Sequence, residues 1–120
     1  MANGQVKQDG GIVVAEWVNP PMNYMTAEGM RELAGHIETW RDPSVRVVIL
    51  TGGVKDRFIT HYSVEELVTS ARDRALMMNV GRSWLHHHNA TLTNLRDLPK
   101  PVIAAMSGST MGGGFETSLS

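Results

Sequence analysis

The sequence contains no cysteine among its 120 residues. Disulfide bonds, thiolate metal ligands and a cysteine nucleophile are therefore all excluded. Lysine and arginine, 11 in all, nearly balance 12 aspartates and glutamates, which gives a formal net charge of −1. With this balance and no run of like charges, the sequence shows no electrostatic footprint for nucleic acid or an anionic membrane surface. We expect neither of these partners.

Long apolar segments are also missing from the sequence. No uninterrupted apolar run approaches the roughly 18 residues of a membrane span, and the polar N-terminus shows no signal-peptide pattern. We therefore expect a cytoplasmic protein. Aromatic residues make up 6% and hydrophobic residues 42% of the chain, so the core is modest and one domain is the upper limit.

Apolar runs separated by a helical pattern predict a mixed α/β domain. Residues 11–18, which Asn19 and two prolines follow, and residues 45–53, which end in two glycines, are rich in β-branched residues, as expected for strands that end in loops. Between them, apolar residues recur at helical spacing after Thr26, which is suited to cap a helix. These apolar positions are Met30, Leu33, Ala34, Ile37 and Trp40. Strand, helix and strand predict an α/β unit with a right-handed crossover.

The second half of the chain predicts further helices and one more strand. Residues 63–68 are typical of a short capped helix. Apolar positions at intervals of three and four predict one long helix over residues 71–95, with its apolar stripe packed inward despite Gly81. Two prolines then end this helix, and residues 102–106 predict a strand that leads into a glycine-rich turn.

That turn reads SGSTMGGG and precedes Glu116. Unpaired backbone N–H groups at a helix start converge on one point and stabilise negative charge there. The turn matches neither the phosphate-binding loop, nor the dinucleotide pattern, nor the G-x-S-x-G motif of serine hydrolases. It therefore predicts an anion hole for another ligand, with Gly112 to Gly114 leaving room for a flat group to approach the backbone. An ordinary close-packed turn is the alternative that these residues leave open.

The segment KPVIAAMSGSTMGGGFE, residues 100–116, resembles the signature of the crotonase superfamily, the enoyl-CoA hydratases and isomerases. Two more segments agree in order: NPPMNYMT is similar to the family's first loop, which contacts coenzyme A, and VRVVILTGG is similar to the strand before its first oxyanion loop. The resemblance implies a crotonase-like ββα spiral fold and a homo-oligomer, a trimer or a hexamer. Because the family is longer, we expect residues 1–120 to be the N-terminal part of one truncated crotonase-like domain.

The resemblance also implies an enzyme that acts on acyl-CoA thioesters and holds an enolate with two backbone N–H groups. These donors fall at Tyr62 and Gly113, and Glu116 takes the position of a catalytic acid/base. We expect further substrate contacts at Met22, Asn23, Thr60, His61 and Gly112. Coenzyme A enters as part of the substrate, and we expect no cofactor. We expect no metal, because the adjacent histidines 86–88 point about 100° apart on a helix and cannot converge on one ion.

One loop departs from the family pattern. Where the family carries Ala-Gly-Ala-Asp, this chain has Thr60-His61-Tyr62-Ser63, which is bulkier at two positions. Either the substrate is smaller or differently oriented, or His61 and Tyr62 contribute side-chain chemistry. The alternative to an enoyl-CoA hydratase/isomerase is a non-catalytic acyl-CoA-binding or scaffolding homologue. A glutamate that only favours the helix dipole is the plain alternative for Glu116.

Overall fold

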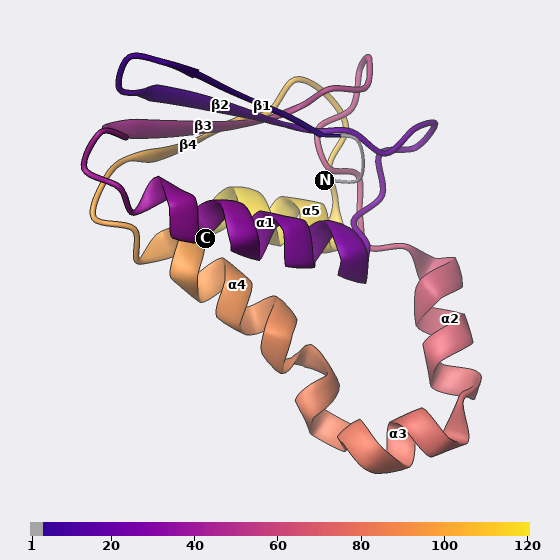
Figure 1. Ribbon diagram of the computed structural model, residues 1–120. Helices are drawn as coiled ribbons and strands as arrows, with labels where there is room; N and C mark the ends of the chain where they lie inside the picture. Colours follow the sequence, from indigo (N-terminus) through magenta and orange to yellow (C-terminus); the bar gives the residue numbers. More distant parts are fainter. Residues whose placement is uncertain (1–3) are drawn as a thin grey trace.

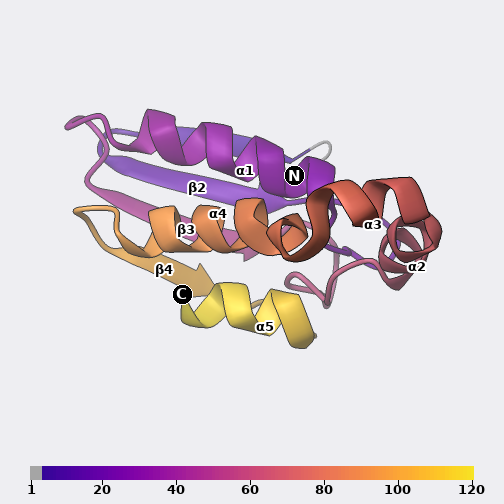
Figure 2. The same ribbon diagram turned by 90° about the horizontal axis from the view of Figure 1, so that it is seen from below.

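The computed structural model describes residues 4–120 of the chain. One four-stranded sheet forms a layer, and α1 and α4 lie against one of its faces (Figures 1 and 2). The strands follow the order β1-β2-β3-β4 across the sheet, with β1 antiparallel to β2 and the other neighbours parallel. Their bounds are β1 Gln5–Asp9, β2 Ile12–Trp17, β3 Val47–Gly52 and β4 Val102–Ala105.

The first predicted α/β unit is present. α1 (Ala27–Trp40) connects β2 to the parallel strand β3, and the side chain of Thr26 caps it by accepting a hydrogen bond from Gly29 N at 3.1 Å. Four of the five predicted apolar positions are buried: Met30, Leu33, Ile37 and Trp40. They pack with the inward residues of β2 and β3, and each large apolar side chain buried in this way contributes roughly 1.5–3 kcal/mol.

The long helix predicted over residues 71–95 is wrong. The chain instead forms α2 (Val64–Arg72), α3 (Arg74–Val80), a 3-10 segment η1 (Gly81–Leu85) and α4 (His86–Arg96). Asp73 separates the first two helices and caps the second, since its side chain accepts from Leu76 N at 2.9 Å. Gly81 adopts φ = +48°, a conformation that an α-helix cannot include. The helix therefore ends at this point, although the apolar spacing in the sequence continues beyond it.

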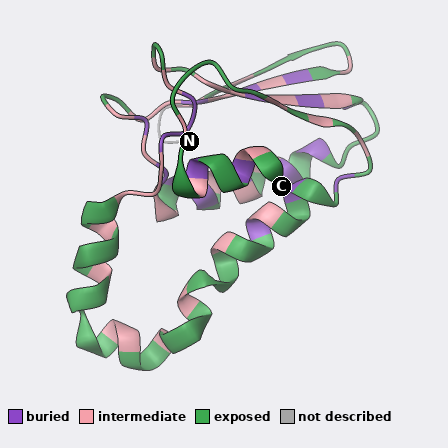
Figure 3. Ribbon diagram, turned by 180° about the vertical axis from the view of Figure 1, so that it is seen from behind, coloured by how far each residue is buried: buried purple, intermediate pink, exposed green. Residues whose placement is uncertain are grey.

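α2 and α3 project away from the sheet (Figure 3), and neither contains a fully buried residue. Of the predicted apolar stripe, Leu95 near the sheet is fully buried, whereas Trp84 and Leu76 are only half-buried. No helix within residues 4–120 is both long and apolar enough to cross a membrane. The last helix is α5 (Gly112–Leu119), whose first three residues are the glycine triplet of the predicted turn.

Candidate active site

Loops at one edge of the sheet bring most of the predicted site residues together. β2, β3 and β4 run parallel, so their carboxyl ends meet at the same edge, where the loops after each strand begin. Met25 N donates to His61 O at 2.8 Å, and Met111 N donates to Thr60 O at 2.6 Å. The loop after β3 is therefore held between the loops that follow β2 and β4.

The three consecutive glycines at the start of α5 serve different purposes. Gly112 has φ = +49°, in the left-handed region that favours glycine. A Cβ on Gly114 would lie 1.9 Å from the carbonyl oxygen of Ile59, so this position admits no side chain. A Cβ on Gly113 would meet Tyr62 N only at 3.8 Å, an ordinary contact. The close-packing alternative thus describes Gly114, whereas Gly113 places its backbone beside that of Tyr62.

The backbone N–H groups of Tyr62 and Gly113 are unpaired within residues 4–120. In the Tyr62 loop, the next amide along the chain, Ser63 N, donates to Met25 O at 2.8 Å, whereas Tyr62 N has no acceptor in this part of the structure. Gly113 lies in the first turn of α5, where an amide has no intrahelical acceptor, and the N-cap residue Met111 provides no side-chain cap. Two free donors from loops far apart in the sequence therefore lie side by side.

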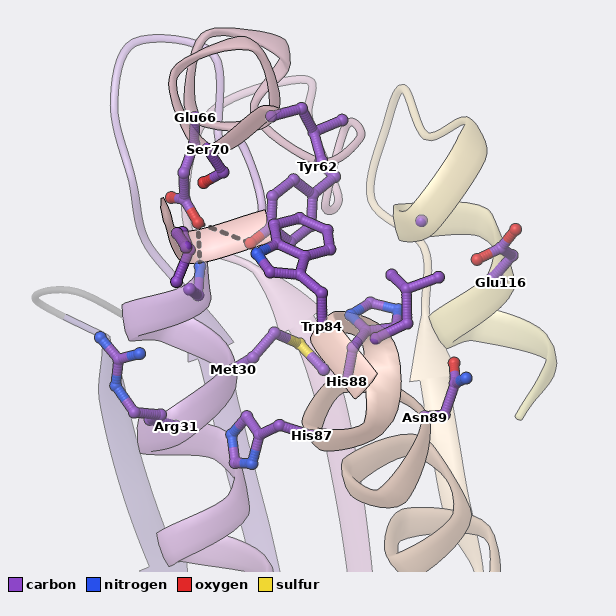
Figure 4. Close-up of a pocket in the computed structure, with 15 residues that line it drawn as sticks. Met30, Arg31, Tyr62, Glu66, Ser70, Trp84, His87, His88, Asn89 and Glu116 are labelled. Atoms are coloured by element: carbon purple, nitrogen blue, oxygen red, sulfur yellow. Dashed lines mark hydrogen bonds between the residues drawn. The ribbon is translucent and has the colours of Figure 1, made fainter. Parts of the chain in front are cut away.

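A cavity of about 720 Å³ opens beside these amides (Figure 4). Tyr62, Gly113 and Glu116, the three residues predicted to be catalytic, all line it. Other lining residues come from α1, α2, α3, η1 and α4, among them Met30, Arg31, Glu66, Leu76, Trp84 and His88. The structure therefore places the predicted catalytic residues on one cavity, whose wall is built by the helices that project from the sheet.

None of the five residues predicted as further substrate contacts lines this cavity. Asn23 is fully buried, and its Nδ2 donates to Trp17 O at 3.0 Å and also to Phe58 O. Thr60 is 3% exposed and its Oγ1 donates to Met22 O at 2.7 Å. These side chains connect the loops that carry the site, and their contact with a substrate stays a prediction.

His61 is not a lining residue of the cavity and instead contacts Tyr24 and Gly112. Its ring is 4.7 Å from that of Tyr24, and a Cβ on Gly112 would lie 3.7 Å from the His61 Cβ. His61 Nδ1 is 2.7 Å from Tyr62 O. Because a carbonyl oxygen only accepts, Nδ1 carries the proton in this hydrogen bond. The side chain of His61 thereby supports the residue whose amide faces Gly113.

Sequence analysis did not identify Glu66, which contacts the side chain of Tyr62. The Tyr62 hydroxyl donates to Glu66 Oε1 at 2.6 Å, and Ala27 N at the start of α1 donates to the same oxygen at 2.9 Å (Figure 4). Desolvation, followed by the hydrogen bond to Glu66, raises the pKa of Tyr62 well above its usual value. The phenol is therefore a neutral donor near neutral pH.

One feature of the sequence could have identified Glu66: it stands three residues after Ser63, which caps α2. In such a capping box the glutamate normally returns to the amide of the capping residue. Here Ser63 Oγ does accept from Glu66 N at 3.2 Å, but Ser63 N is already bonded to Met25 O. The carboxylate of Glu66 is therefore free to reach Tyr62 and α1.

His88 is a second cavity residue to which sequence analysis assigned no functional role. Of the three adjacent histidines, His86 and His87 are exposed, whereas His88 is half-buried. Its ring lies 6.1 Å from that of Tyr62, edge to face, and its Nδ1 is buried without a hydrogen-bond partner among residues 4–120. Burial lowers the pKa of His88, while the charge of Glu116 opposes this shift.

Comparisons with known proteins agree along nearly the whole chain. A family model described as enoyl-CoA hydratase/isomerase matches residues 7–120. The carnitinyl-CoA dehydratase of Proteus mirabilis is 37% identical over 101 residues, covering 83% of this chain and 36% of that protein. That of Citrobacter koseri is 35% identical over 111 residues, covering 92% of this chain and 40% of that protein.

Solved structures show the same fold. An enoyl-CoA hydratase/carnithine racemase from Magnetospirillum magneticum is 30% identical with a TM-score of 0.85, over 98% of this chain and 43% of that one. An enoyl-CoA hydratase from Bacillus anthracis is 25% identical with a TM-score of 0.84, over 98% of this chain and 44% of that one. The chain thus spans less than half the length of each of these relatives.

Proposed function

The chain belongs to the enoyl-CoA hydratase/isomerase family, and from this premise we propose that Tyr62 and Gly113 form the oxyanion hole of an acyl-CoA thioester enzyme. The resemblance to the crotonase superfamily and the crotonase-like α/β fold, both predicted from sequence, are confirmed. The reaction is of the hydratase/isomerase type, in which removing the proton beside the thioester carbonyl, or adding water to the double bond conjugated with it, produces an enolate that a proton then quenches.

The observation that carries this proposal is that two backbone N–H groups without hydrogen-bond partners among residues 4–120 lie beside one cavity. Tyr62 N and Gly113 N come from two loops that the fold holds together, and both residues line the cavity. Backbone donors fixed in advance stabilise the charge that develops on the thioester oxygen, and each such donor lowers a transition state by roughly 3 kcal/mol. Neither donor depends on side-chain identity, so the bulky Tyr62 is compatible with this role.

Glu116 is the proposed general acid/base. It lies three residues after Gly113 in α5, and residues at this spacing share one side of a helix. Glu116 lines the same cavity as Tyr62 and Gly113. A general acid/base must reach the reacting carbon of a substrate whose oxygen is held by these amides, and Glu116 is the acidic residue nearest to Gly113 in the sequence.

Further properties of the protein follow from the family. Coenzyme A is part of the substrate, as the printed names of the carnitinyl-CoA dehydratases and enoyl-CoA hydratases indicate for those proteins. The proton transfer described here requires no additional cofactor. Exposed apolar side chains on the outer face of the sheet, including Ile12 and Ile103, support assembly into a homo-oligomer. Trimeric or hexameric assembly and a cytoplasmic location stay predictions.

A non-catalytic acyl-CoA-binding homologue is the second candidate. It is favoured by the side chain of Tyr62, which stands in the cavity and is fixed by Glu66, where the family pattern has a small residue. A narrowed cavity would still bind a thioester at the two amides without admitting the geometry needed for turnover. Binding and turnover must therefore be measured separately.

The test is the hydration of crotonyl-CoA, followed by the loss of enoyl absorbance, together with direct calorimetric measurement of binding. We expect Glu116→Gln to lower kcat by about 10²–10⁴ while binding is retained. Glu65→Gln is the control, because Glu65 is exposed in α2 and does not line the cavity. Turnover unchanged in Glu116→Gln would refute the acid/base role. Binding without turnover in the wild type would favour the second candidate, and absence of binding would refute both.

A further inference from the structure

The side chain of Tyr62 starts beside the proposed oxyanion hole and runs along the cavity. A Cβ on Gly113 would lie 3.7 Å from Tyr62 Cβ and 3.8 Å from Tyr62 N. Both the side chain and the backbone nitrogen of Tyr62 therefore start next to Gly113. At the other end of this side chain, the hydroxyl reaches Glu66. An acyl group whose thioester oxygen is held at the two amides thus meets the Tyr62 ring within its first few carbons.

Three neighbours hold the Tyr62 ring in this position. Its hydroxyl donates to Glu66 Oε1 at 2.6 Å, and a hydrogen bond to a charged acceptor is about twice as strong as one between neutral groups. Trp84 and His88 lie edge to face with the ring, at centroid distances of 6.2 Å and 6.1 Å. These contacts make the Tyr62 ring a fixed part of the cavity wall.

Glu66 is itself anchored at the start of α1. Its Oε1 also accepts from Ala27 N at 2.9 Å, and a helix N-terminus favours negative charge because its first N–H groups are unpaired. α2, which carries Glu66, contains no buried residue, so this hydrogen bond helps to join the projecting helix to the body of the protein. Glu66 therefore stays within reach of the phenol.

The rings of Tyr62 and Trp84 stand between the two acidic residues of the cavity, Glu66 and Glu116 (Figure 4). Ser70 lies beside Glu66, on the side away from Glu116. A long acyl chain held at the two amides would have to displace the Tyr62 ring to reach the space beside Glu66. A short acyl group ends before it meets this obstacle.

We propose that Tyr62 is a specificity-determining residue that restricts this protein to short acyl groups such as butenoyl, and that Glu66 is the positioning residue that holds its ring. The inference rests on the proposed function, since the thioester must first be held at Tyr62 and Gly113. A smaller substrate is one of the alternatives that the bulky loop at residues 60–63 left open in the sequence.

The dependence of affinity on chain length distinguishes a fixed ring from an open apolar cavity. In an open cavity, each methylene group added to the ligand is buried and favours binding, so affinity rises steadily with chain length. A fixed ring reverses this trend as soon as the chain reaches it, because the ring must then be displaced or the chain bent.

The experiment measures by calorimetry the binding of butanoyl-, hexanoyl-, octanoyl- and decanoyl-CoA, saturated thioesters that cannot be hydrated. In the wild type, we expect affinity to fall by at least about tenfold from butanoyl-CoA to octanoyl-CoA. Tyr62→Ala removes the ring but keeps the backbone N–H group, and it should bind octanoyl-CoA at least about tenfold more tightly than the wild type does.

Two substitutions of Glu66 test its positioning role. Glu66→Ala frees the Tyr62 ring and should weaken the preference for the short chain severalfold. Glu66→Gln keeps an oxygen that accepts from the phenol and should retain the preference. Glu65→Ala is the control, because Glu65 is exposed in α2 and does not line the cavity, and it should behave as the wild type.

An affinity that is constant or rises with chain length in the wild type would overturn the inference and leave the proposed function intact. A Tyr62→Ala variant that keeps the wild-type preference would overturn it as well. Equal preferences in Glu66→Ala and Glu66→Gln would refute the positioning role of Glu66. If no acyl-CoA binds at all, the proposed function itself fails, and this inference fails with it.

Discussion

The carbonyl oxygen of Ile59 occupies the space that a side chain on Gly114 would need, because a Cβ there would lie 1.9 Å away. Thr110 Oγ1 donates to the same oxygen at 2.6 Å. The loop that carries the Tyr62 amide and the helix start that carries Gly113 therefore meet backbone to backbone. This contact fixes the separation of the two proposed oxyanion donors.

Gly114→Ala should destabilise the protein strongly. The new methyl group collides with backbone atoms, which move only if the loop after β3 or the start of α5 shifts. We expect the free energy of unfolding to fall by about 3 kcal/mol or more, as for severe overpacking. Urea unfolding measures this, and acyl-CoA binding should weaken in whatever folded protein remains.

Gly35→Ala is the matched control for this substitution. Gly35 lies in α1 and nothing is within 4 Å of a Cβ built there. Alanine in a helix interior is favoured over glycine, so we expect stabilisation by about 0.5–1 kcal/mol. Equal stability of the Gly114→Ala and Gly35→Ala variants would contradict the close contact between Ile59 and Gly114.

Asn23→Ala tests whether Asn23 supports the fold or contacts the substrate. The substitution leaves the buried carbonyls of Trp17 and Phe58 without the Asn23 donor, which should cost about 3 kcal/mol. Asn23 also has φ = +60°, so Asn23→Gly should be more stable than Asn23→Ala by about 1 kcal/mol. Chemical unfolding of both variants checks these values. Wild-type stability of Asn23→Ala with weaker acyl-CoA binding would instead support the substrate contact predicted from the sequence.

Lys100→Met should lower stability by about 2 kcal/mol. Lys100 Nζ donates to the backbone carbonyls of Trp40, Asp42 and Val45, at and just beyond the end of α1. The last turn of α1 contains no basic residue of its own, so Lys100 supplies both hydrogen bonds and a favourable charge there. Methionine keeps the length of the side chain but removes the charge and the donors.

Lys55→Met provides the comparison in a thermal unfolding experiment. Lys55 is exposed, and its side chain forms no hydrogen bond or ion pair among residues 4–120. We expect the melting temperature of Lys55→Met to remain close to that of the wild type. A similar small change for Lys100→Met would mean that water replaces the ammonium group at these carbonyls without loss.

The sequence predicted those parts of the fold whose signal is local. The face of α1 and the strands β2 and β3 follow strong periodic or continuous apolar patterns and appear as expected. β1 was not predicted, because its residues are mostly polar and exposed and become a strand only through pairing with β2. The breaks at Asp73 and Gly81 were missed because apolar spacing alone does not report backbone conformation.

Of the proposed site, sequence analysis named the two backbone donors but not the side-chain hydrogen bonds that join distant parts of the sequence. Asn23 bonds a residue 35 positions away, and Glu66 bonds an amide 39 positions away. Lys100 reaches a carbonyl 60 positions away, although the same lysine stands in the most specific family segment. No local pattern indicates such partners, since they depend on which loops the sheet brings together.

The last prediction concerns pH and His88, whose pKa is lowered chiefly by burial, with Glu116 opposing the shift and His87 adding to it. Because the unfolded chain has the ordinary histidine pKa of about 6.5, it takes up a proton more readily than the folded protein as pH falls below this value. Stability should therefore fall from pH 6.5 down to the lower pKa of folded His88, where the loss is complete, and be unaffected by His88 at higher pH. His88→Gln should remove this part of the pH dependence of thermal unfolding. A histidine NMR signal absent from His88→Gln that titrates above about 6.5 in the wild type would contradict the burial of this ring.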